Sequence, residues 1–101
     1  MDDTLMSIQV IPKTPNGEDV IPYVDEAIKI IQEAEIPYRV GALETTVQAD
    51  MNTCLILIQK INDRMVELEV PSIISQVKFY HAPEGITIET LTGKYDSDRV
   101  E

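Results

Sequence analysis

The chain has 101 residues, of which 44% are hydrophobic and 26% are charged, and its formal net charge at pH 7 is -10. This length suits one domain with a core of its own, and the composition is ordinary for a soluble globular protein. A surface this acidic repels nucleic acid, and no apolar run approaches the roughly 20 residues of a membrane span. We therefore expect a single domain over residues 1–101 without nucleic-acid or membrane partners. The acidic N-terminus lacks the basic region of a signal peptide, which predicts a cytoplasmic location.

The first quarter of the chain predicts a strand and then a helix. Residues 6–11 alternate apolar and polar side chains, which is the period of a half-buried strand. Residues 19–34 place apolar side chains on one helical face, namely Val20, Val24, Ala27, Ile28 and Ile31. Pro22 is tolerated only in the first turn, so this helix must begin close to it.

Residues 38–50 predict a β-hairpin that leads directly into a second helix. β-branched residues favour strands on both sides of the turn at Leu43 and Glu44, and Asp50 is a good N-cap for the helix. The middle of the hairpin is unusually polar, with Glu44, Thr45, Thr46 and Gln48 close together. This pattern fits either a solvated hairpin or a strand that faces a ligand.

The second half of the chain predicts a helix over residues 51–69 and a strand over residues 73–81. The first half of this helix is apolar nearly all round, which fits either tight packing inside the domain or a subunit contact. The tail from Ile86 alternates like a strand, but Thr87 is also a suitable cap for a short helix that ends at Gly93. We prefer the helix.

The predicted order is therefore β-α-β-β-α-β with a short C-terminal extension. Two right-handed crossovers around one hairpin give a four-stranded antiparallel sheet with both helices on one face, which is the ferredoxin-like α+β architecture. A chain of this length has no further elements to cover the other face of the sheet. We therefore expect association between chains through that face.

The sequence shows no convincing catalytic or metal-binding constellation. It lacks a glycine-rich phosphate loop, a nucleophile elbow and an HExxH motif. The single Cys54 excludes an internal disulfide and a cysteine-based zinc site, and the single His81 fits a surface position at a strand end. We expect no cofactor, no metal and no catalysis.

The segment GALETTVQAD (residues 41–50) resembles the hairpin signature of the small thiamine-binding proteins, the YkoF-like family. That signature reads M-E-T-T-x-E-G or M-G-T-x-x-E-G and is followed by an acidic residue. Here Thr45 and Thr46 match the paired threonines, whereas Gln48 stands where glutamate is common and Ala49 where glycine is common. The segments SIQVIP, YVDEAIKII, IPYRVG and SQVKFYHAPEG are also similar to that family, so the resemblance extends from about residue 5 to about residue 95.

The resemblance implies a ferredoxin-like protein that binds thiamine or its hydroxymethylpyrimidine part as a dimer or tetramer. Hydrogen bonds to the pyrimidine would come from Thr45, Thr46 and Gln48, with a wall from Leu43 and from Phe79 or Tyr80. Negative charge for the thiazolium would come from Glu44 and the acidic surface. The predicted ligand-binding residues are Thr45, Thr46, Gln48, Glu44, Ser7, Gln9, Phe79 and Tyr80.

Two alternatives remain at this stage. One is an enzyme that uses the same cleft with Glu44 or His81 as acid or base, because ferredoxin-like folds also host enzymes. The other is a structural or regulatory oligomerisation module without a small-molecule ligand.

Overall fold

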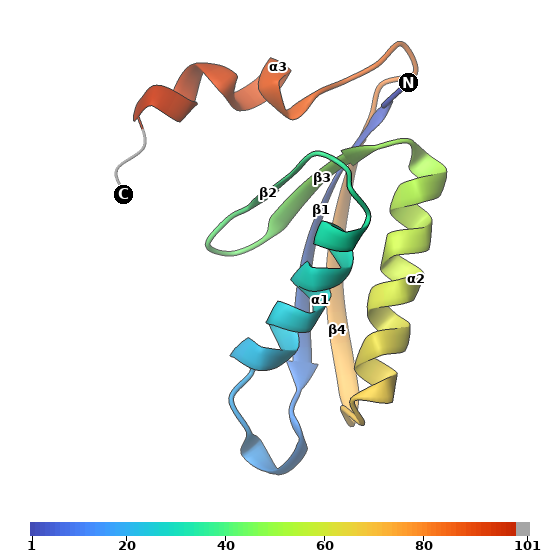
Figure 1. The fold of residues 1–101 in the computed structure, drawn as a ribbon, viewed down its shortest axis with the longest axis vertical. Helices are drawn as coiled ribbons and strands as arrows, with labels where there is room; N and C mark the ends of the chain where they lie inside the picture. Colours follow the sequence, from blue (N-terminus) through green and yellow to red (C-terminus); the bar gives the residue numbers. More distant parts are fainter. Residues whose placement is uncertain (99–101) are drawn as a thin grey trace.

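A four-stranded antiparallel sheet forms one layer of the molecule, and two long helices form the other (Figure 1). The computed structural model describes residues 1–98. Its elements are β1 (Thr4–Lys13), η1 (Pro15–Gly17), α1 (Ile21–Glu33), β2 (Tyr38–Val40), β3 (Thr45–Ala49), α2 (Met51–Glu67), β4 (Ser72–His81), α3 (Ile88–Thr92) and η2 (Gly93–Asp98), where η marks a 3₁₀ helix. The strand order β2-β3-β1-β4 confirms the predicted ferredoxin-like architecture.

The central strand β1 is longer than the hairpin beside it. Strand β4 pairs with β1 along its whole length, from Thr4 to Lys13, whereas β3 pairs with β1 only from Thr4 to Ile8. In Figure 1 the β2–β3 hairpin accordingly covers one end of β1 only. Residues 9–13 of β1 therefore have one edge that pairs with no strand of the described chain; we call it the free β1 edge.

The helix ends follow local sequence signals. Helix α1 has Pro22 in its first turn, as predicted. Helix α2 has Asp50 as its N-cap, and the Asp50 carboxylate accepts a hydrogen bond from the Thr53 hydroxyl, which lowers the pKa of Asp50. It ends two residues earlier than predicted, because Glu69 adopts a left-handed backbone with a φ of 61°. Helix α3 confirms the preferred prediction for the tail, since the Thr87 hydroxyl accepts a hydrogen bond from the Thr90 amide.

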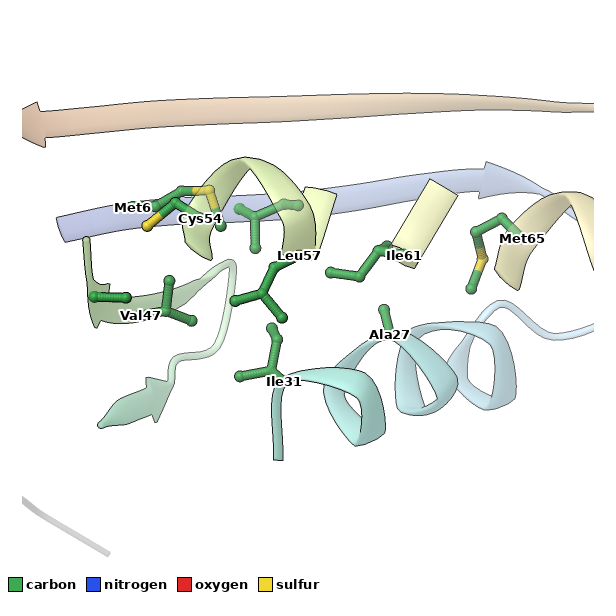
Figure 2. Packing of buried hydrophobic residues seen from close by; sticks show 10 residues of the cluster. Met6, Ala27, Ile31, Val47, Cys54, Leu57, Ile61 and Met65 are labelled. Atoms are coloured by element: carbon green, nitrogen blue, oxygen red, sulfur yellow. The ribbon is translucent and has the colours of Figure 1, made fainter. Parts of the chain in front are cut away.

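The core lies between the sheet and the two long helices (Figure 2). One face of the sheet contributes Met6 and Val47, α1 contributes Ala27 and Ile31, and α2 contributes Cys54, Leu57, Ile61 and Met65. Cys54 is fully buried, and burial raises the pKa of its thiol to about 11. Its role is therefore that of a small apolar core residue.

The sheet face opposite the helices, which we call the open face, is covered at one end by the chain that follows β4. The Ala82 amide donates to the Asp3 carbonyl and the Ile86 amide to the Asp2 carbonyl, at 2.8 and 3.1 Å. These bonds bring Ile86 over the end of the sheet, and Leu5, which points to the open face, is buried there. Helix α3 then extends past this end of the sheet, near the N-terminus (Figure 1).

No helix within residues 1–98 has both the length and the hydrophobicity needed to cross a membrane.

Candidate functional site

A groove of about 310 Å³ lies where α1, the free β1 edge and the tip of the β2–β3 hairpin meet. We call it the hairpin groove. The first turns of α1 line one wall, and the hairpin tip lines the other. Its apolar lining includes Ile8, Val10, Ile11, Val20, Ile21, Val24, Ile28, Val40, Ala42 and Leu43.

Several of these lining side chains are large, apolar and exposed. Leu43 is 79% exposed, Ile21 57%, Val40 47%, Ile11 42% and Val20 37%. Soluble proteins seldom gather exposed apolar side chains in one concave place unless something binds there. The hairpin groove is thus the strongest candidate site in the described part of the chain.

Three of the predicted site residues add polarity to the groove. Glu44 and Thr45 line it from the hairpin, and Gln9 lines it from the free β1 edge. Among the lining residues Glu44 alone is charged. A ligand of this groove would therefore meet apolar walls, one carboxylate, and the backbone amide and carbonyl groups of an unpaired strand edge.

The backbone of the hairpin tip is held in a fixed shape. The Gly41 amide donates to the Glu44 carbonyl at 2.9 Å, which closes the turn beside the groove. A Cβ atom at position 41 would lie 2.8 Å from that same carbonyl oxygen, so the close approach requires glycine. The turn thereby fixes the backbone from which the Glu44 side chain projects.

Glu44 also reaches across the open face of the sheet. Its carboxylate lies 3.6 Å from the ammonium group of Lys78 on β4, and the two side chains are 40% and 77% exposed. Glu44 therefore both lines the hairpin groove and forms an ion pair with a lysine of the open face.

The predicted site residues divide between the two sheet faces. Thr46 pairs with Ser7, and Ser7 pairs with Lys78, so these residues form one row across the open face. Gln48 and Tyr80 flank Leu5 in the next row, farther from the groove. Thr45 and Phe79 point to the helix side instead, because successive side chains of a strand alternate between faces. The structure therefore brings Glu44, Thr45 and Gln9 together, with Ser7 and Thr46 beside them.

Gln48 is engaged within the chain. Its amide nitrogen donates to the Asp2 carboxylate, and its amide oxygen accepts from the Ile88 backbone amide, both at 2.9 Å. Gln48 thus fastens the N-terminus and the start of α3 to β3. The predicted ligand contact of Gln48 stays a prediction.

The histidine that the enzyme alternative invoked lies in a small polar cluster. The Thr4 hydroxyl donates to the Asp3 carboxylate at 2.8 Å and lies 3.0 Å from Nδ1 of His81. Thr4 is fully buried, and the Asp3 carboxylate and the His81 ring already engage its hydroxyl. Within residues 1–98 no group of three histidine, cysteine or acidic side chains is arranged to hold a metal ion.

Sequence reasoning missed the groove itself. Its walls come from α1 and the hairpin, and their proximity depends on the whole fold. Three residues could have indicated the groove, namely Val20, Ile21 and Leu43. They are apolar but lie at a helix start and in a turn, where they remain exposed rather than buried in the core.

The fold and the hairpin groove define a small ferredoxin-like domain with an apolar groove beside its central strand. The family model described as Thiamine-binding protein matches residues 6–97, and this chain belongs to that family. This confirms the resemblance found in the hairpin and the flanking segments.

Individual relatives agree with the assignment. A UPF0045 protein of Clostridium perfringens is 27% identical over 95 residues, which are 94% of this chain and 99% of the relative. A solved Bacillus cereus domain of unknown function superposes with a TM-score of 0.87 at 28% identity, covering 98% of this chain and 95% of the other. A Thermotoga maritima protein provisionally assigned to thiamine biosynthesis or salvage superposes with a TM-score of 0.82 at 26% identity, covering 92% of this chain and 98% of the other.

Proposed function

We propose that this protein binds thiamine or a related hydroxymethylpyrimidine compound in the hairpin groove, without chemistry. The observation that carries the proposal is an apolar groove with one carboxylate, in a chain of the thiamine-binding protein family. Thiamine has two flat rings, an aminopyrimidine and a positively charged thiazolium. An apolar slot with a single negative group suits such a ligand.

Each part of the groove has a role in this proposal. The side chains of α1 and the hairpin tip pack against the ring faces, and Glu44 faces the positive charge. The backbone groups of the free β1 edge form hydrogen bonds with the pyrimidine edge, assisted by the Gln9 amide. The groove volume of about 310 Å³ falls at the lower end of the range for small-molecule sites.

The test is a calorimetric titration of the purified protein with thiamine and with hydroxymethylpyrimidine. Replacing Glu44 by Gln removes the negative charge, and we expect it to weaken thiamine binding about tenfold because a charge-assisted contact is lost. The uncharged hydroxymethylpyrimidine should lose less. Glu33→Gln makes the same charge change on an exposed position of α1 and should leave both affinities unchanged.

Two results would contradict the proposal. One is the absence of saturable binding for both compounds. The other is an equal loss in the Glu33 and Glu44 variants, because a general effect of net charge would then explain the result and the site would lie elsewhere.

The proposal includes a homo-oligomer, either a dimer or a tetramer. Ile74 and Tyr80 leave apolar surface on the open face, with 61% and 52% exposure, and Leu55 and Ile56 do so on the outer side of α2. These same surfaces favour the second candidate function, an oligomerisation module without a ligand. The cytoplasmic location stays a prediction from the sequence.

A further inference from the structure

We infer that the ligand of the hairpin groove carries an anionic arm as well as a cationic ring, so that a phosphate ester binds more tightly than the parent alcohol. This inference rests on the proposed function and names the class of compound that the site prefers. It starts from the ion pair between Glu44, which lines the groove, and Lys78 on the open face.

The two side chains of that pair come from opposite sides of the central strand β1. Glu44 lines the groove, whereas Lys78 lies on β4, two strands away, and points to the open face. Their charged atoms lie 3.6 Å apart, and Lys78 belongs to the row that contains Ser7. A ligand that leaves the groove past the free β1 edge therefore encounters first the carboxylate and then the ammonium group.

A ligand with one positive charge is poorly matched to this arrangement. It has to compete with Lys78 for Glu44, and it leaves the ammonium group without a partner. A ligand with a positive ring and a negative arm satisfies both groups together. The pair is solvent-exposed, and exposed ion pairs contribute little to stability, so exchanging it for ligand contacts has a small cost.

A second observation points to the same place. The Ser7 hydroxyl is buried and has no hydrogen-bond partner within residues 1–98. Buried hydroxyl groups are normally paired, and an unpaired one marks a position where a further group can bind. Ser7 sits directly opposite Lys78 in the β1–β4 register. Binding of the arm therefore requires that the groups covering the Ser7 hydroxyl move aside, after which Ser7 can donate to an anionic oxygen beside Lys78.

The experiment compares two matched pairs of compounds by calorimetry. The pairs are thiamine with thiamine monophosphate, and hydroxymethylpyrimidine with its phosphate. In the unmodified protein we expect each phosphate ester to bind about five- to tenfold more tightly than its parent. Inorganic phosphate alone, used as a third titrant, should bind much more weakly because it lacks the ring.

Variants of Lys78 and Ser7 test whether these two residues cause the preference for phosphate esters. Lys78→Gln should bring the ratio of the two affinities close to one and should slightly strengthen thiamine itself, because Glu44 is freed. Ser7→Ala should reduce the ratio by weakening the phosphate esters more than their parent compounds, and it removes an unpaired hydroxyl, so the fold tolerates it. Lys60→Gln, on the exposed side of α2, should keep the full ratio.

The outcomes distinguish this inference from the function on which it rests. If thiamine binds and its phosphate binds equally or more weakly, the inference is wrong and the proposed function stands. If the phosphate preference survives Lys78→Gln, the arm lies elsewhere and the inference is also wrong. If neither thiamine nor any of the other compounds binds, both fail together.

Discussion

At the scale of single residues, Gln48 illustrates how distant partners decide a side chain's role. The hairpin pattern and its polar character favour a ligand contact at this position, but Asp2 and Ile88 occupy both ends of the amide. Neither partner is close to Gln48 in the sequence. A second hydrogen bond also connects the hairpin to α3, because Nη1 of Arg39 donates to the Thr92 hydroxyl at 2.7 Å.

The role of Gln48 can be tested by comparing two substitutions at this position. Gln48→Leu removes both hydrogen bonds, whereas Gln48→Glu keeps an acceptor for Ile88 and places a carboxylate against Asp2. We expect each variant to lose about 1–3 kcal/mol of unfolding free energy. Hydrogen exchange should distinguish them, because the Ile88 amide loses its acceptor only in the leucine variant. Equal Ile88 exchange rates in both variants would contradict this assignment.

The structure brings some of the predicted site residues together and separates others. Glu44 and Gln9 were predicted and do line the groove. Thr45 and Thr46 were predicted as a pair of ligand contacts, but neighbours in a strand point to opposite faces, so one strand face cannot present both. The alternation rule alone would have separated them. The partners of Gln48 required the three-dimensional structure.

At the scale of elements, α2 offers a matched test of the core. Leu57 is 2% exposed and packs among the core residues, while Leu55 on the same helix is 50% exposed. Leu57→Ala should therefore cost about 2–5 kcal/mol of unfolding free energy, because it leaves a cavity. Leu55→Ala should cost less than about 1 kcal/mol. Denaturant unfolding of both variants measures the difference, and similar costs would mean that Leu55 is buried in an assembly.

The start of α2 predicts a dependence on pH. The hydrogen bond from the Thr53 hydroxyl lowers the pKa of the Asp50 carboxyl below its ordinary value of 3.8. The stabilisation is therefore complete above that ordinary value and is lost as the pH falls through the lowered, folded-state pKa. Asp50→Asn should lower stability at neutral pH, and its difference from the unmodified protein should shrink as the pH falls through the lowered pKa of Asp50. A difference that stays constant on acidification would exclude this origin.

The periodicity of the sequence predicted which segments form helices and strands, whereas the ends of these elements depend on the elements packed beside them. The alternation in residues 6–11 predicted β1 but stopped at Pro12, because proline lacks the amide that a paired strand uses. In the structure β1 continues to Lys13. A proline is tolerated there because one edge of this part of the strand is unpaired. This unpaired edge cannot be predicted from the sequence, because it depends on how far β3 extends along β1 in the folded structure.

At the scale of the whole molecule, the uncovered surfaces predict self-association. Within residues 1–98, the segment after β4 protects the open face at one end only, and Ile74 lies exposed toward the other end. Light scattering at micromolar concentration should give the mass of two or four chains, because apolar surface of this kind is removed from water by association. Ile74→Lys should shift the mass toward one chain if the open face is the contact. A monomeric mass for the unmodified protein would contradict the prediction.

The free β1 edge has a consequence for how the protein behaves when it is concentrated or heated. An unpaired strand edge is a template on which other chains add strands and aggregate. Pro12 and Lys13 stand at one end of this edge and oppose such growth, the first because it lacks an amide and the second because it is charged. The remaining backbone groups adjoin the hairpin groove, so a bound ligand would cover them. On heating, bound ligand should therefore delay the rise in turbidity by more than its effect on the melting temperature alone would explain. A delay no larger than that effect would show that this edge does not start aggregation.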